Sequence, residues 1–196
     1  MQTIPIHTRL FETNENLEQF IYEHIPSLVE GDVVVITSKI VSLAEGNVIS
    51  EDKLNKILRD TSKQIVKTPW TLLVNIKNEW SVNGGADRSN SEIGVIMLPK
   101  DPFRTAQTIL KILKKKFKLK NLGVIITDTR STPLRVGTLG RAIGYAGIKP
   151  LKSYIGKKDL FGRKSRVTIS NHVDALAVSA VLTMGEGNER IPLVII

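Results

Sequence analysis

Short apolar runs alternate with amphipathic segments along the chain, and together they predict a domain with both strands and helices. Apolar runs, several of them rich in β-branched residues, predict strands over residues 33–36, 71–76, 80–82, 93–98, 124–126, 167–169 and 191–196. Residues 1–11 predict an edge strand that leads into a turn. Apolar residues at helical spacing predict helices over residues 15–24, 51–67, 101–120 and 174–184.

The length and composition of the chain fit a single domain over residues 1–196. A chain of this length can bury a proper core and has room for two lobes. The absence of cysteine excludes disulfides and thiolate zinc sites, and the three histidines are too scattered to form a metal site. Because the N-terminus lacks a basic-then-apolar signal and no apolar stretch could span a bilayer, we expect a cytoplasmic protein.

The net charge of +9 points either to nucleic acid or to phosphorylated small molecules. Its densest cluster lies in the predicted helix that begins with Asp101 as N-cap and Pro102 in the first turn. The apolar residues from Phe103 to Phe117 recur at helical spacing, so the lysines lie on the opposite face; they are Lys111, Lys114, Lys115, Lys116, Lys118 and Lys120. No aromatic residues alternate with these lysines to stack on bases, so we do not expect nucleic acid as a partner.

The stretch 122–151 carries the strongest candidate chemistry. The apolar run 124–126 is followed by Asp128 and Thr129, and magnesium prefers one or two carboxylates together with phosphate oxygens and water. Arginines and glycines follow, which suit an anion; they are Arg130, Arg135, Arg141, Gly137, Gly140, Gly144 and Gly147. This pattern predicts a site for a metal-bound polyphosphate. From this stretch alone, an irregular basic surface loop is an equally good interpretation.

Three other loops carry similar groups. The strand at 33–36 ends in Thr37, Ser38 and Lys39. The glycine-rich loop 83–90 contains Asp87, Ser89 and Asn90, and the turn 184–189 contains Glu186 between two glycines. Each loop can present oxygen ligands or backbone amides to a metal-bound phosphate. Each also has an ordinary structural meaning, as a turn, a hairpin loop or a helix-terminating turn.

Taken together and in this order, these motifs resemble the coenzyme F420-0:L-glutamate ligase family. The matching stretches are GDVVVITSKIVSLAEG (31–46), VNGGADRSN (82–90), LPKDP (98–102), GVIITDTRSTPLRVGTLGRAIGYAGIKPL (123–151), KKDLFGRKSRVTI (157–169) and MGEG (184–187). The resemblance implies an α+β fold of mixed β-sheets with flanking helices, and an intertwined homodimer. It also implies GTP (or ATP) as co-substrate, Mg²⁺ or Mn²⁺, and the addition of glutamate to a deazaflavin that bears a phosphodiester.

The resemblance also implies roles for individual residues. It places metal ligands at Asp87, Asp128, Thr129 and Glu186. It places nucleotide contacts at Leu10, Phe11, Ser38, Lys39, Asn90, Met184, Gly185, Glu186, Gly187 and Asn188. Among these groups Asp87 and Asp128 serve catalysis, together with Arg135, which would neutralise charge during phosphoryl transfer.

The chain departs from the family pattern at several places. Leu43 stands where the family usually has a lysine near nucleotide phosphate, and Ser131-Thr132 replaces the usual Gly-Arg. The segment 50–70 is short, and we expect no C-terminal extension after Ile196. Two hypotheses therefore remain: a nucleotide- and metal-dependent ligase for small-molecule substrates, or a non-catalytic protein that binds a nucleotide or another phosphorylated ligand.

Overall fold

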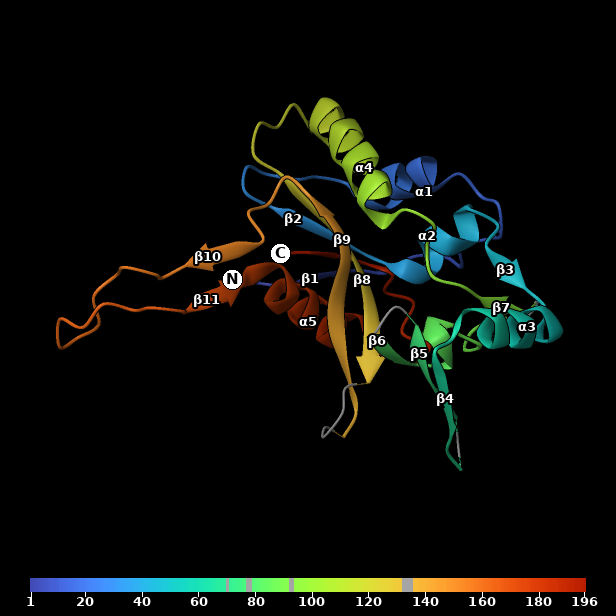
Figure 1. The fold of residues 1–196 in the computed structure, drawn as a ribbon. Coiled ribbons are helices and arrows are strands. Elements are labelled where there is room, and N and C mark those ends of the chain that lie inside the picture. Colours follow the sequence, from blue (N-terminus) through green and yellow to red (C-terminus); the bar gives the residue numbers. More distant parts are fainter. Residues whose placement is uncertain (70, 77–78, 92–93, 132–135) are drawn as a thin grey trace.

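The centre of the molecule is a five-stranded mixed sheet. The computed structural model of the chain describes residues 1–69, 71–76, 79–91, 94–131 and 136–196. The strand order is β1-β12-β2-β8-β9 (Figure 1), and the strands are β1 Ile4–Ile6, β12 Leu193–Ile195, β2 Val33–Thr37, β8 Gly123–Ser131 and β9 Thr138–Ala146. Only β2 and β8 run parallel, whereas the other neighbours are antiparallel. The predicted edge strand at the N-terminus and the predicted C-terminal strand are both confirmed.

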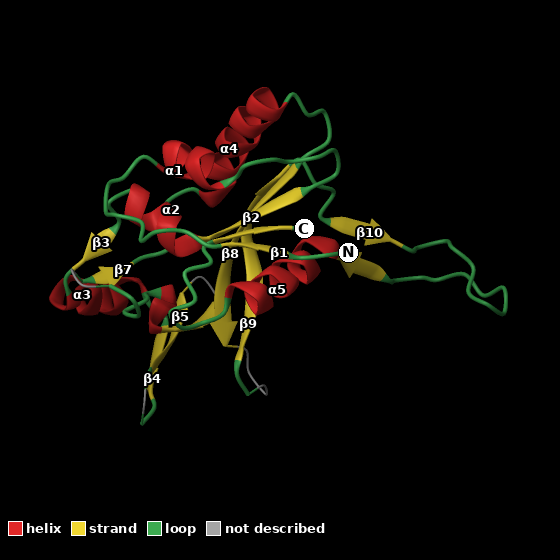
Figure 2. Cartoon of the chain, turned by 180° about the vertical axis from the view of Figure 1, so that it is seen from behind, coloured by secondary structure: helices red, strands yellow, loops and turns green. Residues whose placement is uncertain are grey.

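Helices cover both faces of this sheet. Alternate residues of β2 point to opposite faces, so Val34 and Ile36 belong to one hydrophobic cluster and Val35 to another. The first cluster packs against α1 Leu17–His24, α2 Ser38–Ala44 and α4 Pro102–Phe117. The second packs against α5 His172–Met184, on the other side of the sheet (Figures 1 and 2). This arrangement confirms the α+β class.

Helix α4 forms as its sequence predicts. The Asp101 side chain accepts a hydrogen bond from the Arg104 backbone N–H at 2.9 Å, and Pro102 occupies the first turn. Ala106, Ile109 and Leu113 are buried, and the helix ends with lysines in its last turn. Cations at this end are favourable because the helix dipole is negative there.

A third, smaller hydrophobic cluster lies beside the main sheet. Its buried members are Leu54, Leu58, Val74, Ala86 and Val95. The elements of this region are β3 Val48–Ile49, α3 Glu51–Thr61, β4 Gln64–Lys67, β5 Leu72–Ile76, β6 Glu79–Val82, the 3₁₀ turn Asn83–Gly85 and β7 Val95–Ile96. The prediction of one helix over 51–67 is wrong after Thr61. Ile65 and Val66, a β-branched pair, instead form β4 against β5, and Ile65 is 42% exposed.

Two of the glycines after Asp128, Gly140 and Gly144, pack against helices. The predicted strand end is wrong, because β8 continues to Ser131, and β9 contains several of the residues that suggested an anion-binding loop. A Cβ atom on Gly144 would lie 2.5 Å from the Pro102 backbone, and one on Gly140 would lie 2.6 Å from the Ala177 carbonyl oxygen. These glycines therefore let α4 and α5 approach β9, so the anion-binding interpretation of both is wrong.

A long two-stranded arm projects from the body (Figures 1 and 2). Its base is formed by β10 Leu151–Ser153 and β11 Ile169–Asn171, which pair antiparallel. The strand expected at 167–169 thus begins only at Ile169. We use the name "arm" for residues 151–171. Among the described residues, no helix is both long enough and apolar enough to cross a membrane.

Candidate active site

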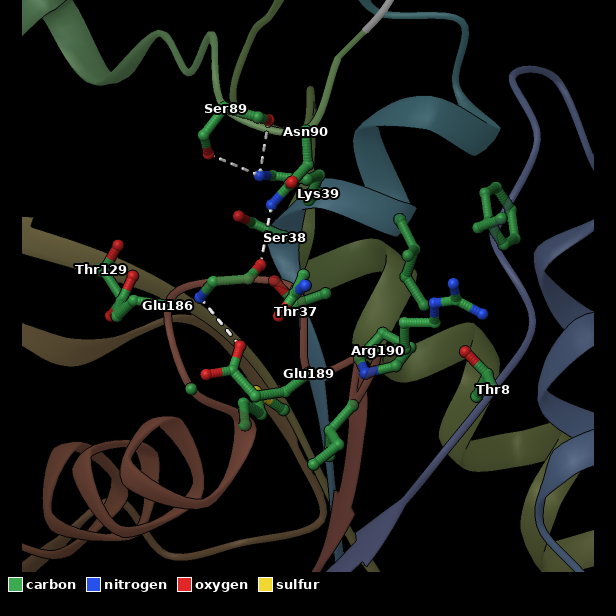
Figure 3. A pocket seen from close by; sticks show the side chains of 18 of the residues that line it. Thr8, Thr37, Ser38, Lys39, Ser89, Asn90, Thr129, Glu186, Glu189 and Arg190 are labelled. Atoms are coloured by element: carbon green, nitrogen blue, oxygen red, sulfur yellow. Dashed lines mark hydrogen bonds between the residues drawn. The ribbon is translucent and has the colours of Figure 1, made fainter.

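A cavity of about 390 Å³ opens where the parallel pairing of β2 and β8 ends (Figure 3). Segments that are distant in sequence line it: Thr8–Phe11, residues from Thr37 to Leu43, residues from Asp87 to Asn90, Thr127–Thr129, and the loop Met184–Pro192. The last paired residues of the two parallel strands are Thr37 and Thr127. The residues that follow them are therefore brought side by side.

Those neighbours are Ser38 and Asp128. The Ser38 hydroxyl donates a hydrogen bond to Asp128 Oδ1 at 2.7 Å. Burial raises the pKa of Asp128 above its ordinary value, and the negative charges of Asp87 and Glu186 raise it further, against the opposing hydrogen bonds from Ser38 and the Thr129 backbone. Three carboxylates from separate segments thus act on one another across one cavity.

Lys39 joins α2 to the loop that contains Asp87. Its ammonium nitrogen lies 2.9 Å from Asp87 Oδ2 and 2.9 Å from both the carbonyl and the hydroxyl oxygen of Ser89. The Ser89 backbone N–H donates to the other Asp87 oxygen at 2.7 Å. Burial alone would raise the pKa of Asp87, but the hydrogen bonds from Lys39 and Ser89 outweigh it, and the pKa lies below its ordinary value.

The loop after α5 closes another side of the cavity. The Asn90 side-chain amide donates to the Gly187 carbonyl oxygen at 3.0 Å, which ties this loop to the Asp87 loop. The Thr138 hydroxyl donates to Glu186 Oε1 at 3.3 Å. In Figure 3, Glu189 and Arg190 extend from this loop, while Ser38 and Lys39 face the same space from α2.

Comparisons with known proteins agree with this arrangement of motifs. The family model described as F420-0:Gamma-glutamyl ligase matches residues 5–56 and 52–196. The chain belongs to this family. It is 35% identical to the coenzyme F420:L-glutamate ligase of Methanosarcina mazei, over 95% of this chain and 81% of that protein. It is 34% identical to the protein of the same name from Methanocaldococcus jannaschii, over 100% of this chain and 87% of that protein.

Nearly every site residue expected from the resemblance to this ligase family lines the one cavity. They are Leu10, Phe11, Ser38, Lys39, Asp87, Asn90, Asp128, Thr129, Met184, Gly185, Glu186, Gly187 and Asn188. Arg135 lies outside the described residues. Arg130 and Arg141 do not line the cavity, and the Arg130 guanidinium donates to the Trp80 carbonyl oxygen at 2.8 Å.

The backbone N–H groups of the turn 184–189 have partners other than those expected from the sequence. The Gly185 N–H donates to the Val181 carbonyl oxygen at 3.0 Å, as the end of α5. The Gly187 N–H donates to Glu189 Oε2 at 2.8 Å. Both amides therefore have partners within the chain, whereas the sequence suggested that they would face a phosphate.

Helix α2 is the main element of the site that the sequence motifs do not predict. The motifs predict no helix here and leave a turn after the strand at 33–36 as the ordinary structural meaning, but Ser38–Ala44 form a helix that directly follows β2. Ile40 and Leu43 line the cavity from this helix, one turn apart, and give it an apolar side. The spacing of Ile40, Val41 and Ala44 is a helical signal that could have indicated this element.

The donor set suits a hard divalent cation. Asp87, Asp128, Thr129 and Glu186 offer only oxygen atoms to the cavity. Within the described residues, no three acidic or histidine side chains are clustered closely enough to hold an ion by themselves. Magnesium commonly takes one or two carboxylates and completes its shell with substrate phosphates and water, so these residues fit it.

Proposed function

We propose that this chain is an amide ligase that adds L-glutamate, or another amino acid, to a carboxylate acceptor, using GTP or ATP and Mg²⁺ or Mn²⁺. The observation that carries the proposal is the convergence of Asp87, Asp128 and Glu186 on one cavity, from segments far apart in sequence. Relatives that share about a third of its sequence are named coenzyme F420:L-glutamate ligases, which supports glutamate as the added amino acid.

Amide formation needs an activated acceptor because a free carboxylate does not react with an amine in water. In the proposed reaction, an acceptor carboxylate oxygen attacks the γ-phosphorus of the nucleotide. The bond between the γ-phosphorus and the bridging oxygen breaks, and the nucleoside diphosphate leaves with the electron pair. The neutral amine of glutamate then attacks the acyl carbon of the acyl phosphate and forms the C–N bond. The bond between the acyl carbon and the phosphate oxygen breaks, inorganic phosphate leaves with the electron pair, and the nitrogen loses one proton to water.

The residues of the chain contribute position and charge to both steps. Asp87, Asp128, Thr129 and Glu186 would hold the divalent cation, which supplies charge neutralisation on the phosphates when bound. Ser38 fixes the orientation of the Asp128 carboxylate through its hydrogen bond. The apolar side formed by Leu10, Ile40 and Leu43 suits the nucleobase. The reaction needs no nucleophilic side chain.

A phosphate-release assay with GTP or ATP, Mn²⁺, L-glutamate and a panel of carboxylate acceptors tests this function. The panel includes a deazaflavin that bears a phosphodiester. We expect phosphate release that requires both an acceptor and glutamate. Nucleotide binding without release under every condition would instead support a non-catalytic binding protein. Leu43 favours that second function, because it presents an alkyl group where the family pattern has a lysine.

We also propose that the chain works as a homodimer. The arm exposes large apolar side chains, among them Leu160, Phe161 and Val167. Helix α5 is apolar around most of its surface, and its outward-facing Leu182 is 85% exposed. A helix that is apolar all round is usually buried, so a second copy of the chain is the occupant we assign to these surfaces.

A further inference from the structure

Several charged groups of the cavity already have hydrogen-bond or ion-pair partners within the chain. A lysine ammonium has three N–H donors, and Lys39 has three acceptors at 2.9 Å, one on Asp87 and two on Ser89. Its donors are therefore all in use, and none is left for a phosphate. One oxygen of Asp87 is neutralised by the same contact. Lys39 thus stands where a bound cation would contact Asp87.

A second internal pairing involves Glu189. Its carboxylate accepts the Gly187 backbone N–H at 2.8 Å and lies directly against Gly185, in the space that a side chain at that position would occupy. A glycine turn with a backbone N–H that faces a cavity can donate to an anion there, and the Gly187 N–H is such a donor. Glu189 thus stands where a phosphate oxygen would contact the turn.

We propose that the free cavity is held in a self-paired state, in which Lys39 occupies the place of the divalent cation and Glu189 the place of a phosphate. A metal-bound polyphosphate displaces both groups. The inference rests on the proposed function, because it takes that ligand as the substrate of the cavity. It assigns Lys39 and Glu189 as positioning residues that keep the two loops in place before the substrate arrives.

The exchange conserves charged contacts when metal and polyphosphate arrive together. A divalent cation at Asp87 releases the ammonium of Lys39, which then donates to a phosphate oxygen. A phosphate at the Gly187 N–H releases Glu189 to solvent, where its carboxylate is hydrated. When metal arrives alone, the ammonium that it releases has no new anion in the cavity. Lys39 should therefore compete with the metal alone and assist the complete substrate.

Binding of Mn²⁺ alone, followed by electron paramagnetic resonance, tests the role of Lys39. Because the competing ammonium is lost, Lys39→Met should bind Mn²⁺ about fivefold more tightly than the wild type. The same variant should bind GTP with Mn²⁺ about tenfold more weakly, because a charge-assisted phosphate contact is lost. Lys53→Met, which removes an exposed lysine on α3, serves as the control and should change neither affinity.

Binding of pyrophosphate without metal, measured by calorimetry, tests the role of Glu189. Glu189→Asp keeps the charge but shortens the side chain, so that it no longer reaches the Gly187 N–H. It should bind pyrophosphate about fivefold more tightly, and Glu189→Gln should do so as well. Glu18→Gln, on the exposed face of α1, controls for the change in net charge.

These outcomes separate the inference from the proposed function. An unchanged or weaker Mn²⁺ affinity in Lys39→Met would overturn the role of Lys39. If Glu189→Asp behaves like the wild type while Glu189→Gln binds more tightly, long-range charge explains the effect and the role of Glu189 is overturned. Either result leaves the ligase proposal standing, whereas wild-type protein that binds no nucleotide with Mn²⁺ refutes both.

Discussion

Folded proteins usually bury apolar side chains and expose charged ones, and the cavity and the arm depart from this rule in opposite ways. The cavity holds carboxylates and an ammonium in partly buried positions, whereas the arm leaves Leu160 98% exposed and Phe161 84% exposed. Charges can find partners within one chain, as Lys39 and Asp87 do. Exposed apolar side chains gain nothing until another surface covers them. In the cavity, Lys39 and Asp87 are therefore paired without a ligand, whereas the exposed apolar side chains of the arm form the surface that we propose a second copy would cover.

Helix α5 connects these two regions. Its N-terminal end lies beside the arm, and its C-terminal end leads directly into the loop that carries Glu186 and Glu189 (Figures 1 and 2). A second copy that covers the exposed Leu182 would lie next to this loop. In the proposed homodimer, the arm would control assembly, the cavity would control the chemistry, and α5 would link the two regions.

The largest expected effect comes from the cavity. Asp128→Asn should lower nucleotide-dependent turnover at least about 100-fold, because the substitution removes one carboxylate from the metal-binding set. It should leave the proposed dimer intact, since Asp128 belongs to β8 and not to the arm. Asp60→Asn, an exposed change on α3, provides the control in the phosphate-release assay. Full activity in Asp128→Asn would show that this carboxylate is not a metal ligand.

A packing variant tests whether the glycines of β9 support the fold or bind ligand. Gly144→Ala should lower the free energy of unfolding by about 2 kcal/mol, because its Cβ would lie 2.5 Å from the Pro102 backbone. Urea denaturation gives the value, and Gln107→Ala, on the exposed face of α4, should change it little. A stable Gly144→Ala with lost nucleotide affinity would restore the anion-binding interpretation that the structure contradicts.

A variant of the arm tests whether its exposed apolar side chains form the proposed dimer interface. The double variant Leu160→Ser, Phe161→Ser should weaken the dimer by about 2–4 kcal/mol, since it removes two large apolar side chains from the surface assigned to the second copy. Analytical ultracentrifugation across a dilution series measures this change, with Val29→Ser, an exposed apolar residue outside the arm, as control. A double variant as dimeric as the wild type would remove the arm from the interface. Nucleotide affinity measured on the monomeric variant reports whether α5 transmits the loss to the cavity.

Sequence patterns were most successful where the determining contacts are local. The N-cap at Asp101 and the strand over 124–126 follow from residues a few positions apart, and both are present. The cavity residues were also identified, because each follows or lies near a predicted element and the order of motifs matches one family. Folding then brings them together through the parallel register of Thr37 with Thr127.

The failures share a physical cause, which is contact between distant segments. Gly144 is required by Pro102 and Gly140 by Ala177, and no local pattern marks either pair. The helix predicted over 51–67 includes Ile65, but pairing with Val74 in β5 decides the conformation of this residue. The internal partners of Lys39 and Glu189 were likewise invisible, because side-chain pairing inside a cavity depends on the folded geometry.

The smallest expected effect is a difference in melting temperature between two variants, each of which neutralises one carboxylate of the cavity. The raised pKa of Asp128 means that the folded protein holds the proton of this carboxyl more tightly than the unfolded chain does. The protein therefore loses stability as pH rises from the ordinary aspartate range through the raised pKa. Asp128→Asn should therefore raise the melting temperature at neutral pH, and the gain should shrink as pH falls. Asp87 has a lowered pKa, so Asp87→Asn should lower the melting temperature at neutral pH, with the loss disappearing in acid. Scanning calorimetry of metal-free protein between pH 4 and pH 8 compares the two variants directly, and differences of the same sign would show that the two carboxylates do not experience the opposite environments described above.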